Sequence, residues 1–155
     1  LHLSLRRQRQ MCIRDRVSTI NKRDFNDKDI DKLLEIKDNI VTIDFSKSSI
    51  TDSIFLRLSE FPNLTVLRLT ETKVRGEGIE KLSVLENLKR INLVNTEFDA
   101  AFLESLTQFK SLEKVYLFQE SRNFITDVIP DDKIDLFDFG EYKLKNLPSD
   151  KEVYN

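Results

Sequence analysis

Residues 64–74, LTVLRLTETKV, and residues 88–98, LKRINLVNTEF, repeat one pattern of apolar and polar residues 24 positions apart. The same pattern begins at Ile40 and at Leu112, so four units start at a constant spacing of 24 residues. The third and fifth residues after each start are apolar, as Leu67 and Leu69 are in the second unit. This alternation predicts a short strand in every unit, with one face in the core.

The second half of each unit predicts a helix. Apolar residues recur there at helical spacing, namely Ile79, Leu82 and Leu85 in one unit and Leu103, Leu106 and Phe109 in the next. A hydroxyl stands eight residues after three of the starts, at Ser48, Thr72 and Thr96. Such a hydroxyl can bond backbone groups where the chain turns off the strand. Each unit is therefore expected to form a strand, a turn and a helix.

A unit of this length cannot bury its apolar face alone, so each unit has to stack on its neighbours. The LxxLxL core of the units is typical of leucine-rich repeats. The sequence thus predicts an α/β fold, specifically a leucine-rich-repeat solenoid with parallel strands on the concave face and helices on the convex face. A weaker first unit, one residue longer, is expected to start near Asp15.

The two ends of the chain depart from the repeat. Residues 1–16, LHLSLRRQRQMCIRDR, have no strand or helix period and resemble translated sequencing-adapter sequence, so we interpret them as a disordered artefact. The alternative is a basic arm that binds nucleic acid or anionic lipid. Residues 17–119 are assigned to the repeats, with further repeats expected upstream. Residues 120–148 are assigned to a C-terminal cap with a short strand, and residues 149–155 to a disordered tail.

Charge and composition restrict the chemistry. Without residues 1–16 the chain keeps 20 basic and 26 acidic residues, a net charge of −6, which disfavours nucleic acid as a partner. The same segment holds the only histidine, His2, and the only cysteine, Cys12. Residues 17–155 therefore lack the groups for a Ser-His-Asp triad, a Cys-His pair or a usual zinc site. We expect no catalytic residue, no metal site and no cofactor in this part of the chain.

The predicted strands also define a candidate binding surface. Residues two, four and six after each start point away from the core, because positions three and five point into it. Aromatic and arginine side chains supply much of the energy at protein interfaces. The candidate binding residues on the concave face are therefore Arg68, Arg90, Asn92, Lys114, Tyr116 and Phe118. The alternatives are a solvated face, or Tyr116 and Phe118 covered by the C-terminal segment.

Three further motifs are assigned to structure. Asp131, Asp132, Asp135 and Asp138 lack the spacing of a calcium loop, so they are interpreted as solvated loop acids. Gly76 and Gly78 are interpreted as turn residues. Asn63 begins a glycosylation sequon, yet Asn87 and Ser111 recur in register with it, which favours a structural role.

The repeat form LxxLxLxxTxV is similar to that of bacterial leucine-rich-repeat proteins. FNDKDIDKLLEIKDNIVTIDFSKSSITD (residues 25–52), LEKVYLFQ (112–119) and FGEYKLKNLPSD (139–150) resemble the C-terminal part of membrane-associated c-type-cytochrome proteins of planctomycete and Bacteroidetes type. The resemblance implies a periplasmic or membrane-associated parent with a membrane span and haem upstream. No residue of this chain matches the haem motif. Glu120 departs from the pattern where a threonine would recur, and Phe61-Pro62 departs within the second unit.

These observations predict a non-catalytic protein-interaction or structural module, a fragment of a larger c-type-cytochrome protein. Its expected partner is a protein or a neighbouring domain of the parent chain, with no nucleic acid and no direct membrane contact. One alternative is a cytoplasmic bacterial effector or regulator that binds a protein through its repeats. Another is an electron-transfer role of the intact parent. An enzyme built from the acidic C-terminal segment is the remaining alternative.

Overall fold

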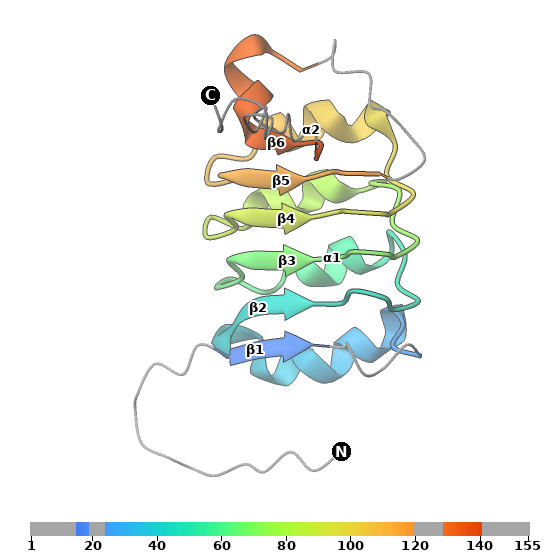
Figure 1. Cartoon of the computed structure of the whole chain (residues 1–155). Helices are drawn as coiled ribbons and strands as arrows, with labels where there is room; N and C mark the ends of the chain where they lie inside the picture. Colours follow the sequence, from blue (N-terminus) through green and yellow to red (C-terminus); the bar gives the residue numbers. More distant parts are fainter. Residues whose placement is uncertain (1–14, 19–23, 120–128, 141–155) are drawn as a thin grey trace, which may run out of the picture.

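The computed structural model describes residues 15–18, 24–119 and 129–140, and its main element is one six-stranded parallel sheet. The strands follow one another in chain order across the sheet, with every neighbouring pair parallel (Figure 1). They are β1 (Asp15–Ser18), β2 (Ile40–Asp44), β3 (Val66–Arg68), β4 (Arg90–Asn92), β5 (Lys114–Tyr116) and β6 (Phe137–Asp138). The predicted α/β class and the predicted parallel sheet are therefore confirmed.

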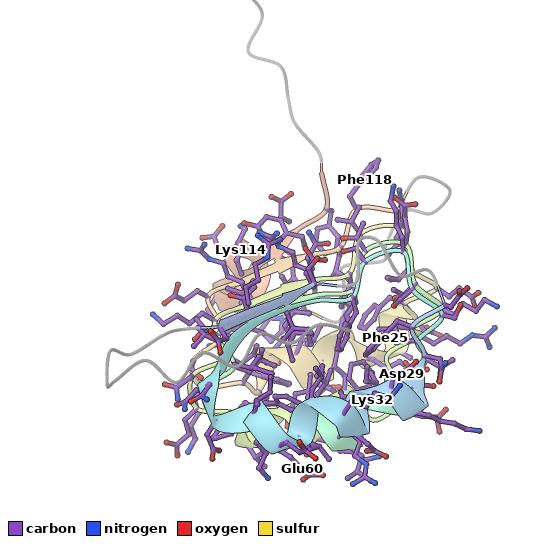
Figure 2. The ribbon with its side chains drawn as sticks, turned by 90° about the horizontal axis from the view of Figure 1, so that it is seen from below. Phe25, Asp29, Lys32, Glu60, Lys114 and Phe118 are labelled. Carbon is purple, nitrogen blue, oxygen red and sulfur yellow. The ribbon has the colours of Figure 1, made fainter. Side chains whose placement is uncertain are left out.

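Most helical segments are short, and those between residues 27 and 107 pack against one another on one side of the sheet. Two are α-helices, α1 (Ile54–Leu58) and α2 (Leu103–Thr107), whereas four are 3₁₀-helices: η1 (Asp27–Asn39), η2 (Ile79–Val84), η3 (Ala100–Phe102) and η4 (Asp131–Leu136). Figure 2 shows Asp29, Lys32 and Glu60 on this side, and Lys114 and Phe118 on the opposite side. Ile79 and Leu82, three residues apart, lie in the 3₁₀-helix η2, whose three residues per turn suit this spacing. Leu103 and Leu106 have the same spacing but lie in the α-helix α2.

The register of the sheet follows the repeat spacing in its centre. Thr42 pairs with Val66, Val66 with Arg90, and Arg90 with Lys114, each 24 residues apart. At the first strand Asp15 pairs with Ile40, which agrees with a longer first unit that starts near Asp15. A register shift directly after Asp15 then pairs Val17 with Ile43. The shift turns Val17 toward the core, because neighbouring strand residues face opposite sides.

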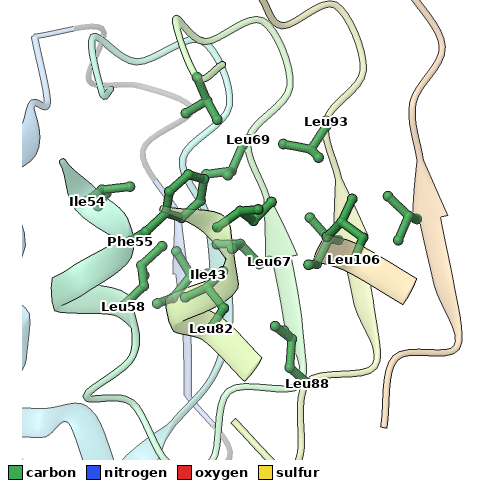
Figure 3. Packing of buried hydrophobic residues seen from close by; sticks show 14 of the residues in the cluster. Ile43, Ile54, Phe55, Leu58, Leu67, Leu69, Leu82, Leu88, Leu93 and Leu106 are labelled. Atoms are coloured by element: carbon green, nitrogen blue, oxygen red, sulfur yellow. The ribbon is translucent and has the colours of Figure 1, made fainter. Parts of the chain in front are cut away.

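The core lies between the sheet and the helices. The inward strand residues Ile43, Leu67, Ile91 and Val115 are each 0% exposed. Figure 3 shows Ile43 and Leu67 packed beside Phe55 and Leu58 of α1 and Leu82 of η2. The six apolar residues that predict helices are all buried in the same cluster: Ile79, Leu82, Leu85, Leu103, Leu106 and Phe109. Stacked units thus share one continuous apolar layer.

The hydroxyl expected after each strand makes a backbone hydrogen bond. The Ser48, Thr72 and Thr96 side chains donate to the carbonyl oxygens of Phe45, Leu69 and Leu93 over 2.6, 2.7 and 2.8 Å. The residue before each hydroxyl has a positive φ: 61° at Lys47, 56° at Glu71 and 51° at Asn95. The hydroxyl satisfies a buried carbonyl where the chain makes this left-handed turn, which explains its recurrence.

The Thr72→Val variant is expected to lower the free energy of unfolding by about 1.5 kcal/mol, because it removes the buried donor for the Leu69 carbonyl at nearly constant volume. Urea unfolding followed by circular dichroism measures the change. The matched control is Thr107→Val, which removes an exposed bond of the same kind from Thr107 to Glu104. We expect less than about 0.5 kcal/mol for that control. An equal loss in both variants contradicts the role assigned to the buried hydroxyl.

A related bond explains the recurring residue at the unit junction. The side-chain amides of Asn63 and Asn87 donate to the carbonyl oxygens of Asp38 and Pro62 over 2.7 and 3.0 Å, and Ser111 donates to Leu85 over 3.4 Å. Each bond ties one unit to the preceding one. The structural role predicted for Asn63 is confirmed by this bond.

The two ends of the sheet are formed by strands β1 and β6. Strand β6 lies within the segment assigned to the cap and pairs Phe137 with Val115. At the other end, Asp15 and Arg16, although assigned to the artefact, belong to strand β1. Residues 1–14, 120–128 and 141–155 lie outside the described residues. The predictions of an artefact, of Glu120 as a departure and of a disordered tail therefore stay predictions.

Candidate functional site

The face of the sheet opposite to the helices, here called the outer face, carries the predicted binding residues in rows. Register pairing places one row across the sheet through Arg16, Thr42, Val66, Arg90 and Lys114. A second row runs through Ser18, Asp44, Arg68, Asn92, Tyr116 and Asp138. Two residues after the second row, the next outward positions are occupied by Ser46, Thr70, Val94 and Phe118. All six predicted site residues therefore lie on one face.

Asp44 is the most enclosed charged group of the outer face. Its side chain is 4% exposed and forms ion pairs with Arg16 at 2.9 Å and with Arg68 at 3.5 Å. Ser46 donates to Oδ1 of Asp44 from its hydroxyl over 2.7 Å and from its backbone N–H over 3.3 Å. Burial by itself raises the pKa of Asp44, but the Ser46 bonds, the Arg16 bond and the Arg68 charge together lower the pKa below its usual value. Asp44 is therefore a charged structural group.

The same local turn recurs on alternate strands. Oδ1 of Asn92 accepts from the backbone N–H of Val94 over 3.0 Å, and Oδ1 of Asp138 accepts from the N–H of Gly140 over 2.9 Å. Asp44 makes the equivalent bond with Ser46. Sequence reasoning missed this pattern, although Asp44 and Asn92, each four residues after the start of a unit, are a visible signal for such side-chain turns. These turns lie at the ends of β2, β4 and β6.

A polar hollow of about 440 Å³ lies over β2, β3 and β4. Arg68, Arg90 and Asn92 line it together with Tyr116 and the enclosed Asp44. The Thr70 hydroxyl, also in the lining, donates to Oδ1 of Asn92 over 2.9 Å. Four of the six predicted site residues therefore meet in this hollow.

An apolar hollow of about 390 Å³ adjoins it, and Tyr116 lines both. Val94, Phe118, Asp138 and Gly140 complete its lining. Phe118 is 43% exposed, and a Cβ on Gly140 would lie 2.6 Å from its Cδ2 atom. Because Gly140 has a φ of 74°, glycine suits both the turn and the close approach. Part of the segment after β6 thus covers Phe118, as one sequence-based alternative expects, while much of the ring stays exposed.

Lys114 is the one predicted site residue that lines neither hollow. Its amino group donates to the carbonyl oxygen of Asp135 over 3.0 Å, which ties β5 to the 3₁₀-helix η4. A residue that the prediction omitted, Gln119, plays a similar part. Its buried side-chain amide donates to the Leu93 carbonyl and to the Thr96 hydroxyl over 2.9 and 3.2 Å. Both side chains hold the last repeat in place.

Two other features, a metal site and a membrane-spanning helix, are absent from the described ranges. No group of three or more histidine, cysteine, aspartate or glutamate residues there is placed to hold a metal ion. No helix there is long and apolar enough to cross a membrane.

No model of a known protein family and no curated protein matches this chain.

Proposed function

We propose that this chain is a leucine-rich-repeat segment that acts as a non-catalytic docking module and binds a protein, or a neighbouring domain of its parent chain, through the outer face. The observation that carries the proposal is the pair of adjoining hollows that share Tyr116. Two arginines and two aromatic residues line them, and these are residue types that dominate binding energy at interfaces.

The repeat supports this proposal over an irregular α/β domain. Strands pair at a constant offset of 24 residues from Thr42 to Lys114. The three units that start at Ile40, Leu64 and Leu88 share the buried hydroxyl bond and the junction bond. Repeat proteins of this kind present extended surfaces for binding. A docking role also suits Asp44, because its lowered pKa and its ion pairs keep the carboxylate charged and engaged rather than available as a general base near neutral pH.

The resemblance of the repeats to membrane-associated c-type-cytochrome proteins supports a periplasmic parent protein with haem upstream of this chain. The direct test is the gene sequence upstream of the codon for Val17, obtained by a long read without adapters. A Cys-x-x-Cys-His motif and a membrane span in frame support the parent assignment. An in-frame continuation without them contradicts it and favours the cytoplasmic regulator. Persistence of the arginine-rich stretch contradicts the artefact assignment.

Selection of random dodecapeptides displayed on phage against the purified protein tests the docking role. We expect the selected peptides to bind the outer face, so that Tyr116→Ala weakens them by at least about tenfold, as is typical for a central aromatic residue. The control is Leu56→Ser on α1, which alters a 59% exposed apolar side chain on the helical side. Peptides that lose binding with Leu56→Ser and keep it with Tyr116→Ala contradict the proposal, as does a selection without any binder.

A further inference from the structure

The polar hollow has an excess of hydrogen-bond donors. Asn92 uses its Oδ1 atom to accept from Thr70 and from Val94, which leaves its Nδ2 group as the outward donor. Within the described part of the chain, neither this amide group nor the hydroxyl of Tyr116 has a hydrogen-bond partner. Both residues line the same hollow. The fixed Oδ1 contacts hold the amide of Asn92 in one orientation.

The positive charge of the hollow is also in excess. Arg90 forms no ion pair within the described residues, although its charge helps to lower the pKa of Glu113, a carboxylate that pairs with Lys89. Arg68 shares Asp44 with Arg16. Without Arg16, which belongs to the segment interpreted as an artefact, the two rows of the outer face still carry Arg68, Arg90 and Lys114 against the carboxylates of Asp44 and Asp138. The whole chain, by contrast, has a net charge of −2. An acidic molecule thus carries a locally basic surface, which favours a negatively charged occupant there.

The spacing of the two arginines suits an extended peptide. Arg90 stands on the strand beside Arg68 and two residues before Asn92, the register partner of Arg68. A strand separation of about 4.8 Å and a rise of about 3.3 Å per residue put their Cα atoms about 8 Å apart. Acidic side chains two residues apart on an extended peptide are separated by about 6.6 Å, within reach of two flexible arginines. Val66 and Tyr116 also line the hollow and can supply apolar contact to such a peptide.

We propose that the polar hollow binds an extended acidic peptide segment, with carboxylates at alternate residues paired to Arg68 and Arg90 and hydrogen-bonded by Asn92 Nδ2 and the Tyr116 hydroxyl. This inference rests on the proposed docking role and names its partner class. Nucleic acid fits the surface less well, because a phosphate backbone needs a longer run of basic groups and the chain as a whole is acidic.

The test uses a capped peptide, acetyl-Ser-Glu-Val-Glu-Ser-amide, titrated into the ¹⁵N-labelled full-length protein at low ionic strength. Nuclear magnetic resonance gives both the Kd and the location, because the side-chain amide of Asn92 reports on the hollow. The matched peptide acetyl-Ser-Gln-Val-Gln-Ser-amide has the same shape without charge. We expect it to bind at least about tenfold more weakly, since charge-assisted bonds are roughly twice as strong as neutral ones.

Asn92→Asp is the sharpest protein variant. Aspartate already occupies the equivalent positions at Asp44 and Asp138 with the same turn, so the fold tolerates the change. The variant replaces the outward donor by a second carboxylate oxygen, and we expect at least tenfold weaker binding of the acidic peptide. Arg90→Gln is expected to weaken binding by about tenfold. The control Arg57→Gln removes an arginine on α1 with its pairs to Asp31 and Glu60, and is expected to leave the Kd unchanged.

The outcomes separate this inference from the docking role on which it rests. Equal affinity for the glutamate and glutamine peptides, or an unchanged Kd in Asn92→Asp, overturns the acidic-peptide site. Tighter binding of inorganic phosphate or of a short single-stranded oligonucleotide than of the peptide also overturns it. Displayed peptides that require Tyr116 but carry no acidic residues leave the docking role standing and remove only the acidic partner. If the acidic peptide does not bind and no displayed peptide requires Tyr116, both proposals are rejected.

Discussion

Replacing Leu67 by alanine is expected to lower the free energy of unfolding by about 3 kcal/mol, the middle of the range for a buried leucine. Leu67 is 0% exposed in the central strand β3 and pairs in register with Ile43 and Ile91. Its side chain packs beside α1 and η2 (Figure 3). Because each unit is stabilised mainly by its neighbours, a cavity at this position weakens two unit interfaces at once.

Urea unfolding of Leu67→Ala, compared with the unaltered protein, measures this loss. The matched control is Leu56→Ala, the same chemical change at a side chain that is 59% exposed on α1. We expect the control to shift stability by less than about 0.5 kcal/mol. If Leu67→Ala costs no more than Leu56→Ala, the continuous core between sheet and helices is not what holds the units together.

Much of the fold could be predicted because a repeated pattern samples each position several times. Leu67, its equivalents and the three turn hydroxyls stand out by recurrence, and they occupy the buried positions that the pattern predicts. The helix type was harder to predict. Apolar residues three apart fit both helix types over one or two turns, as Ile79 and Leu82 in η2 and Leu103 and Leu106 in α2 show. The shift at Val17 lies in a unit of different length, where recurrence gives no guide.

The sequence predicts on which side of the sheet the candidate site residues lie, but it does not predict which residues they contact. Alternation along the strands places Arg68, Arg90 and Tyr116 outward, since inward neighbours define the opposite side. It does not indicate that Asp44 is almost enclosed, because that depends on side chains from two adjacent strands. The packing of Gly140 on Phe118 depends in the same way on a segment outside the repeat. The period of a strand predicts the side of the sheet on which a side chain lies, whereas the burial of a polar side chain depends on residues from neighbouring units.

Asp44→Ala is expected to lower the free energy of unfolding by about 3 kcal/mol near neutral pH, because it removes the enclosed partner of two arginines and the acceptor for Ser46. Asp44→Asn is expected to cost less, about 1 kcal/mol, since an asparagine oxygen can accept the same Ser46 bonds and the arginines are 52% and 45% exposed to water. Asn92, which accepts from Val94 in the equivalent turn, is the precedent within this chain.

The pH dependence of the Asp44→Asn difference has a definite sign. The pKa of Asp44 is lowered from 3.8 in the folded chain, so its charge contributes stability above the unfolded pKa, and that contribution is lost as the pH falls through the folded pKa. The difference between the unaltered protein and Asp44→Asn is therefore expected to be constant from about pH 7 to pH 5 and to shrink below about pH 4. A difference that grows as the pH falls would show that the carboxylate is destabilising in the folded state. Repeating the titration in the Arg16→Gln background separates the two arginines, because Arg68 then remains the only ion-pair partner described for Asp44.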